Sequence, residues 1–223
     1  MEKIEYVLPS EIEKRSFQII DGELRKKNIV LPEEEKFITM RAIHASADFD
    51  YAKTLCYSKD AVKIVKNLLK NGAHIVTDTN MALAGINKKV LAEFGGEAHC
   101  FMADEDVILD AKKNQITRAA SSMKKAAQLK VPLVFAIGNA PTALIELNKM
   151  IEEKIFSPDF IIALPVGFVN VVAAKNLILK GKIPFIVNKG RKGGSNIAAA
   201  VCNAILYELK DELKDEKNLV EKN

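Results

Sequence analysis

The feature that most constrains this chain is a regular alternation of short apolar runs and longer segments after Gly72. Each run has the length of a strand and is apolar at most positions, which is typical of parallel strands buried on both faces. The segments between them have the length and composition of helices. The pattern therefore predicts an α/β fold with a mostly parallel sheet of about five strands and helices on both faces. The expected strands are residues 73–77, 97–102, 131–137, 160–164 and 183–187.

The part of the chain before Gly72 is expected to be helical. Ser10 and Glu13 have the spacing of a capping box, which predicts that a helix begins there. A second helix is expected from Pro32 to about His44, and a third from Ser58 to the Asn-Gly stop signal at residues 71–72. The chain is therefore expected to begin with an N-terminal helical segment.

Composition favours a single domain over residues 1–223, with residues 209–223 as a charged helix end and tail. Hydrophobic residues make up 48% of the chain and charged residues 28%, and no linker or repeat divides it. No apolar run approaches the roughly 20 residues that cross a membrane. The charged N-terminus lacks the apolar stretch of a signal peptide, and the three cysteines are widely spaced. These features predict a cytoplasmic protein that binds no membrane.

Composition and motif spacing argue against several classes of function. Trp is absent and aromatic residues are only 6% of the chain, so a stacking surface for nucleic acid is not expected. No His, Cys, Asp or Glu residues have the spacing of a metal site, and none is predicted. The GRKGGS sequence at 190–195 lacks the spacing of a phosphate-binding loop, and no GxGxxG follows a strand.

Small, polar and glycine-rich residues follow four of the expected strands. In parallel sheets, free backbone amides and helix N-termini meet at the carboxyl ends of the strands, where they can bind anions. For the glycine-rich loop, ligand binding and a tight turn with solvated charges are equally consistent with the sequence. The candidate binding residues in these segments are Thr79, Asn80, Asn139, Gly190, Arg191, Lys192, Gly193, Gly194 and Ser195.

Charged residues on two expected helices complete the candidate set. Arg41 and His44 are three residues apart and share a helix face, which Asp48 would extend if the helix continued. An acid–base site and a helix-end histidine that interacts with the dipole are both consistent with this pair. Arg118 lies in the first turn of a helix capped by Thr117, where its charge opposes the dipole, so we expect it to bind a ligand.

The two remaining histidines, His74 and His99, fall on expected strands and are interpreted as core or structural residues. The three cysteines have no partner spacing that marks a nucleophile and are expected to be buried thiols.

Seven segments of the chain, in order, resemble the precorrin-8 methylmutase family of the cobalamin pathway, which includes the cobalt-precorrin-8 enzymes. The resemblance extends from about residue 5 to about residue 208, and GNAPTA, PVGFV and GRKGGS are its most specific strings. The segments are RSFQII (15–20), RAIHASADFD (41–50), TDTNMALAGI (77–86), TRAASSM (117–123), AIGNAPTAL (136–144), LPVGFV (164–169) and GRKGGSNIAAA (190–200).

This resemblance implies an isomerase that moves a methyl group between neighbouring carbons of a carboxylate-rich tetrapyrrole. It also implies a homodimer with no dissociable cofactor, with His44 as the acid–base residue and Ser16 and Arg41 in contact with the substrate. The small positive net charge of +4 would help to attract such a polyanion. One departure is the run at residues 170–175, which lacks the acidic residue common in the family.

Two other functions remain as alternatives. One is a corrinoid-binding carrier without turnover, although His44 and Arg41 are both present. The other is an α/β enzyme that uses the glycine-rich loops to bind a phosphorylated metabolite.

Overall fold

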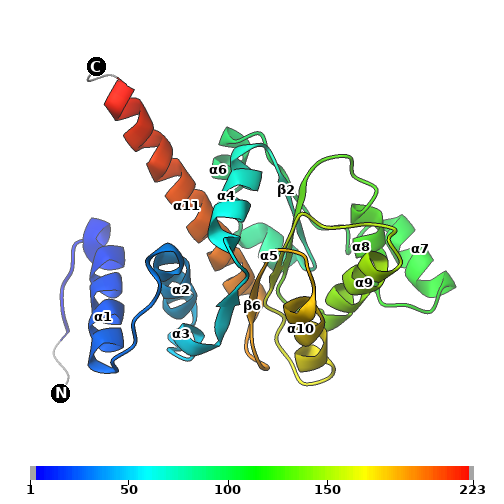
Figure 1. Ribbon diagram of the computed structural model, residues 1–223, viewed down its shortest axis with the longest axis horizontal. Coiled ribbons are helices and arrows are strands. Elements are labelled where there is room, and N and C mark those ends of the chain that lie inside the picture. The colour runs from blue at the N-terminus through cyan, green and yellow to red at the C-terminus, as the bar shows by residue number, and fades with distance from the viewer. Residues whose placement is uncertain (1–3, 221–223) are drawn as a thin grey trace.

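A six-stranded sheet lies at the centre of the computed structural model, which describes residues 4–220 (Figure 1). The strand order is β1-β6-β5-β4-β2-β3, with β1 antiparallel to β6 and every other neighbouring pair parallel. The strands are β1 (Leu55–Tyr57), β2 (His74–Thr77), β3 (Ala98–His99), β4 (Leu133–Ile137), β5 (Phe160–Ala163) and β6 (Phe185–Asn188).

Side chains that alternate along the strands supply two separate apolar cores. Val134 and Ala136 of β4 pack into one core, whereas Leu133, Phe135 and Ile137 pack into the other. All five side chains are completely buried. This explains why the strand appears as a continuous apolar run: both of its faces are covered by helices.

The helices divide between the two faces of the sheet (Figure 1). One face is covered by α2 (Glu33–Ser46), α4 (Ala61–Lys70), α6 (Lys88–Glu93) and α11 (Ser195–Val220), and α1 (Ile12–Lys26) packs outside this layer against α2. The other face is covered by α8 (Arg118–Ala126), α9 (Pro141–Glu152) and α10 (Val171–Lys180), with α7 (Glu105–Lys113) against α8. The short helices are η1 (Pro9–Glu11), α3 (Tyr51–Thr54) and α5 (Asn80–Gly85).

The predicted fold class is confirmed, and one strand was not predicted. All five expected strands are present within one or two residues of their expected starts, although β3 pairs over only two residues. The additional strand, β1, is three residues long and pairs antiparallel at the edge of the sheet, with Cys56 opposite Val187. Three residues between helical segments carry no detectable period of two, so the sequence pattern could not reveal this strand.

Two expected helix starts were wrong in detail. Ser10 lies within η1, and α1 begins at Ile12 with Glu11 as its N-cap and no side-chain capping bond. Glu13 does not close a capping box because its carboxylate instead binds Arg41 of α2. The helix expected from Ser58 begins at Ala61, while Ser58 accepts a hydrogen bond from the Phe185 amide.

Helix α11 runs from the carboxyl edge of the sheet across the layer formed by α2, α4 and α6. Its charged second half is tied to α4, where Lys66 pairs with Glu208 at 3.0 Å and with Glu212 at 2.8 Å. The helix end expected over residues 209–223 is therefore helical as far as Val220, and residues 221–223 lie outside the described part. None of the helices in residues 4–220 has the length and apolar character of a membrane-crossing segment.

Candidate functional site

The loops after β2 and β4 are joined by a buried carboxylate at the carboxyl edge of the sheet. Asp78 follows β2, and its side chain accepts hydrogen bonds from the backbone amides of Gly138 and Asn139, both at 2.8 Å, and of Ala140. Burial raises the pKa of Asp78, and the three amide bonds oppose that rise. Asp78 therefore fixes the loop that leads into α9.

Two buried side chains donate hydrogen bonds to backbone carbonyls of the glycine-rich loop after β6. Lys175 of α10 is fully buried, and its ammonium donates to the carbonyl oxygens of Gly190 at 3.0 Å and Lys192 at 2.7 Å. The Asn188 side chain also donates to the Lys192 carbonyl, at 2.8 Å. Burial lowers the pKa of Lys175 to about 8. These contacts leave the outer side of the loop exposed.

Close backbone approaches join the glycine-rich loop to its neighbours. A Cβ atom at Gly193 would overlap the Leu164 carbonyl oxygen, and one at Gly138 would lie 2.7 Å from the Ser195 Cα. The hydroxyls of Thr79 and Ser195 are 2.8 Å apart, which connects the starts of α5 and α11. All four loops at this edge therefore form one continuous rim, hereafter the carboxyl rim (residues 78–80, 138–141, 164–168 and 189–195).

A small hollow of about 220 Å³ lies between α1 and α2, and His44 and Ser16 both line it. Its walls are mainly apolar and include Ile19, Ile20 and Phe49. His44 is exposed in the last turn of α2, where the helix dipole favours positive charge. The Ser16 hydroxyl donates to the Ile12 carbonyl at 2.9 Å. The hollow is below the roughly 300–1,000 Å³ of small-molecule pockets, so it would accept only part of a macrocycle.

Arg41 lies beside this hollow but does not line it. Its guanidinium forms two hydrogen bonds with the Glu13 carboxylate, at 2.9 and 2.6 Å, and sits over the rings of Phe17, Phe37 and Tyr207. These hydrogen bonds lower the pKa of Glu13. Phe17 also contacts the His44 ring, with centroids 5.5 Å apart. Arg41 is therefore a fixed guanidinium that binds a carboxylate through two hydrogen bonds, and the Phe17 ring lies between it and His44.

The hollow and the carboxyl rim adjoin each other. Helix α2 ends at Ser46 with Ala47 in the left-handed conformation, so Asp48 does not extend the Arg41–His44 stripe. Asp48 and Asp50 instead accept from the Lys192 ammonium, both at 2.6 Å. These ion pairs attach the glycine-rich loop to the chain that follows His44.

The remaining predicted binding residues also lie at the carboxyl rim or next to it. Asn80, Asn139, Arg118 and Arg191 are exposed. Thr117 caps α8 as predicted, accepting from the Ala120 amide, and its hydroxyl donates to Thr142 of α9 at 2.8 Å. Arg118 is thus on the α8–α9 side of the rim, whereas His44 is on the α2–α11 side.

His74 and His99 form a half-buried pair away from this rim, with His74 Nδ1 2.8 Å from His99 Nε2. Burial, and then the neighbouring His74 ring, lowers the pKa of His99.

Three residues that shape the site were not singled out from the sequence, and two of them carried a weak signal there. An acid directly after an apolar strand, as at Asp78, was a detectable signal because strand ends gather at one edge. Lys175, near the middle of a mostly apolar helix, was another. Glu13 gave no such signal, because its position also matched a capping box.

Comparison with known proteins gives a consistent result over nearly the whole chain. Residues 11–208 match the family described as precorrin-8X methylmutase. The chain is 40% identical over 199 residues to the cobalt-precorrin-8 methylmutase of Priestia megaterium, covering 89% of this chain and 88% of that protein. It is 39% identical over 208 residues to the Salmonella typhimurium protein of the same name, covering 91% and 97%.

A solved structure matches this chain over a similar share of its length. It is described as precorrin-8x methyl mutase from Thermus thermophilus and is 32% identical to this chain. The superposition covers 91% of this chain and 98% of that one, with a TM-score of 0.82.

Proposed function

Because the chain belongs to the precorrin-8X methylmutase family, we propose that the His44 hollow and the carboxyl rim together bind its tetrapyrrole substrate. The protein is a methylmutase, an isomerase of cobalamin biosynthesis that moves a methyl group within one molecule. Such a reaction needs a macrocycle held in one orientation and a proton supplied at the correct moment. The observation that carries the proposal is that His44 and Ser16 line one hollow, which Lys192 joins to the carboxyl rim.

His44 is the proton donor and acceptor in this proposal. A methyl shift around a conjugated ring is easier when the ring system carries positive charge. His44 as an imidazolium donates a proton to a ring nitrogen, the methyl group migrates, and the proton returns to His44. Exposure of the imidazole and its place at a helix C-terminus support this role.

Ser16 contacts the substrate edge that enters the hollow, and Arg41 binds a substrate carboxylate beside it. In our proposal Glu13 marks the position of a substrate carboxylate, because the Arg41 fork binds carboxylates through two parallel hydrogen bonds. Glu13 is 59% exposed and can turn away, whereas the Arg41 side chain is only 13% exposed and needs a carboxylate partner, which the substrate would supply when it replaces Glu13. The Ser16 hydroxyl then turns from its own helix toward the substrate.

The carboxyl rim binds the other carboxylates of the macrocycle. Arg118 and Arg191 are both exposed at or next to the rim, and Lys192 is anchored by Asp48 and Asp50. Backbone and side-chain donors of the rim complete the predicted set, which comprises Thr79, Asn80, Asn139, Gly190, Gly193, Gly194 and Ser195. A fixed arrangement of donors suits a ligand with several carboxylates, since each added contact restricts its orientation.

We propose that the enzyme accepts the cobalt-containing substrate, since the Priestia megaterium and Salmonella typhimurium relatives are both named cobalt-precorrin-8 methylmutase.

We also assign the protein to the cytoplasm, because the cysteines of residues 4–220 are free thiols, as in reducing compartments.

His44→Ala tests the proposed mechanism directly. The variant should bind the tetrapyrrole with near-native affinity and convert it about 10²–10⁴-fold more slowly, because only the proton transfer is removed. Binding is measured by absorbance titration, and turnover by the visible-spectrum change of product formation, with cobalt-containing and metal-free substrate in parallel. Gln18→Ala, an exposed change on α1, is the control. Full turnover by His44→Ala would rule out the proton-transfer role.

A further inference from the structure

Two histidines and a glutamate meet at the edge of the sheet opposite β1, away from the carboxyl rim. His74 begins β2, while Glu97 directly precedes β3 and His99 ends it. The parallel register pairs Ile75 with Ala98 and Val76 with His99, so His74, Glu97 and His99 all point to the same face of the sheet. The α8–α9 side of the molecule lies on this face, because Val76 belongs to that core.

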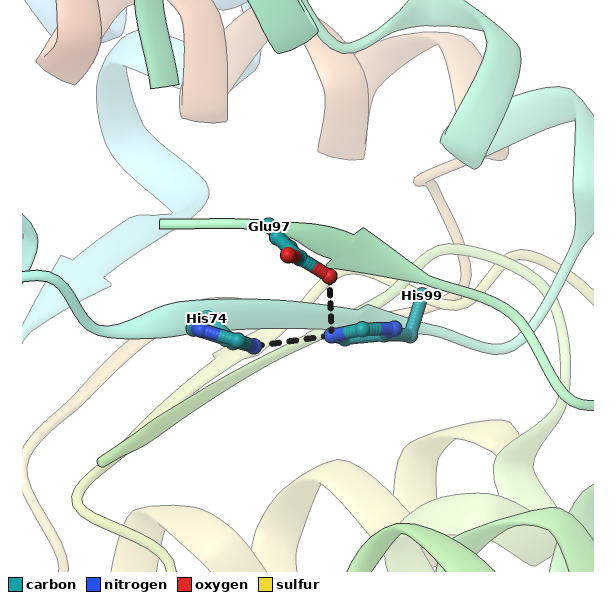
Figure 2. A group of neighbouring side chains, drawn as sticks. All are labelled: His74, Glu97 and His99. Atoms are coloured by element: carbon teal, nitrogen blue, oxygen red, sulfur yellow. Dashed lines mark hydrogen bonds and ion pairs between the residues drawn. The ribbon is translucent and has the colours of Figure 1, made fainter. Parts of the chain in front are cut away.

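The ligand atoms of these three residues converge. His74 Nδ1 and His99 Nε2 are 2.8 Å apart, and the Glu97 carboxylate is 4.0 Å from the same His99 nitrogen. Figure 2 shows the two rings directed toward each other with the carboxylate reaching the gap between them. All three ligand atoms lie within 4.8 Å of one another. Ligands about 2.0–2.2 Å from a shared zinc-type ion lie about 3–3.5 Å apart, so small side-chain rotations suffice.

The surroundings hold the rings in place. The His99 ring stacks on Phe101, with centroids 5.6 Å apart and planes 9° from parallel, and also on His74 at 5.1 Å. Both histidines are half-buried, whereas Glu97 is exposed and free to turn. Two ring nitrogens are thus fixed by strands and stacking, and the third ligand can adjust to an ion.

We propose that His74, Glu97 and His99 bind a divalent transition-metal ion of the zinc class and thereby join the edge strand β3 to β2. Two imidazole nitrogens and one carboxylate oxygen are a donor set that suits Zn²⁺, Co²⁺ and Ni²⁺. The ion takes the place of the proton shared by the two rings, and water completes its coordination. The role is structural: β3 pairs over only two residues, so a metal cross-link would strengthen its attachment.

The spacing of these residues in the sequence did not indicate this site. His74 and His99 are 25 residues apart, and only the pairing of β2 with β3 brings them together.

Metal titration of the untagged, chelator-treated full-length protein tests the proposal without any measurement of activity. Co²⁺ is followed by its visible absorption and Zn²⁺ by equilibrium dialysis. We expect one ion per chain, and a rise in Tm of about 5 °C or more at a hundred-fold excess over Kd. His74→Gln and His99→Gln should each weaken binding by at least the roughly 10–100-fold lost with an outer-shell contact. Glu97→Gln should weaken it less, because an amide oxygen can still coordinate.

His44→Gln is the matched control, since it removes the third histidine of the chain and should leave metal affinity unchanged. Imidazole nitrogen chemical shifts of the wild-type protein provide a readout that needs no variant: the His74 and His99 signals should move on Zn²⁺ addition and the His44 signals should not. Absence of saturable binding, a Co²⁺–thiolate band, or affinity unchanged in both ligand variants would overturn the proposal.

Discussion

At the residue scale, substitutions at Glu13 and Arg41 can distinguish two roles for Arg41: pairing with Glu13 and binding a substrate carboxylate. If Glu13 occupies the place of a substrate carboxylate, Glu13→Gln should leave kcat unchanged and lower KM, because the substrate no longer competes with a charged side chain. Arg41→Lys should raise KM by about ten-fold or more, since an ammonium cannot form the paired hydrogen bonds of the fork. Steady-state kinetics on purified tetrapyrrole measure both.

One outcome of these kinetics would contradict the proposed role of Arg41. A fall in kcat/KM for Glu13→Gln as large as that for Arg41→Lys would mean that the ion pair itself maintains the site, and that Arg41 does not anchor the substrate.

Lys175 should make the stability of the protein depend on pH in the alkaline range. Burial lowers its pKa from 10.5 to about 8, so between these values the unfolded chain binds more protons than the folded one. Stability therefore rises with pH in this window. The wild type should gain about 2 kcal/mol relative to Lys175→Met between about pH 8 and about pH 10. Urea denaturation at several pH values measures the difference, and a constant difference across the window would contradict the burial of a titrating ammonium.

The sequence indicated positions within single helices better than it indicated contacts between distant segments. Spacing on a helix was enough to place Arg41 and His44 on one face, and Thr117 was identified correctly as a helix cap. Partners distant in sequence were not predictable: the Arg41–Glu13 pair joins two helices, and Lys175 reaches a loop beyond β6. Such contacts depend on tertiary packing, which no local pattern encodes.

At the scale of elements, the glycine-rich loop depends on a close approach to the end of β5. A methyl group at Gly193 would overlap the Leu164 carbonyl, so Gly193→Ala must displace the loop. Displacement of binding groups by about 1 Å can cost on the order of 10²-fold in kcat/KM, and we expect a loss of this size. Enzyme kinetics measure the loss, and circular dichroism verifies that the fold is retained.

Gly22→Ala is the matched control for this substitution. Gly22 lies within α1, and a methyl group added there would meet no atom within 4 Å beyond its chain neighbours and the backbone of its own helix. The change should raise stability by about 0.5–1 kcal/mol, as expected for a helix interior, without loss of activity. Normal kinetics in Gly193→Ala would show that the loop does not need its observed path.

Long elements with buried faces were predictable, whereas one short edge strand was missed and the other was predicted too long. The strands β4 and β5 were evident because every residue in them is buried. The edge strand β1 has three residues and only one strand neighbour, and β3 is two residues long where six had been expected. Edge strands carry less apolar sequence because they are less completely covered.

At the scale of the whole molecule, apolar side chains gather on the exterior near the carboxyl rim. Met81 is 69% exposed, Phe168 82% and Val169 77%. The hollow beside His44 also has too little volume for a whole macrocycle. Both features support the expectation that a second copy of the chain covers this region and completes the binding site.

Phe168→Asp should therefore shift the protein from two chains to one and reduce kcat/KM, because a carboxylate is costly to bury in an interface. Light scattering coupled to size-exclusion chromatography measures the mass. The corresponding control is Ile155→Asp, which changes an exposed apolar residue after α9. A wild-type protein that is fully active as a single chain would contradict the proposed dimer.

The course of α11 has a consequence for synthesis on the ribosome. Ile20 and Ile38, from the first two long helices, share one core with Ile205 and Leu209 of the last helix. Until that last helix leaves the exit tunnel, the apolar faces of the early helices lack the surface that they finally cover. The nascent chain must therefore keep these faces from aggregating until Ile205 and Leu209 have emerged, and the region around His44 is completed only then.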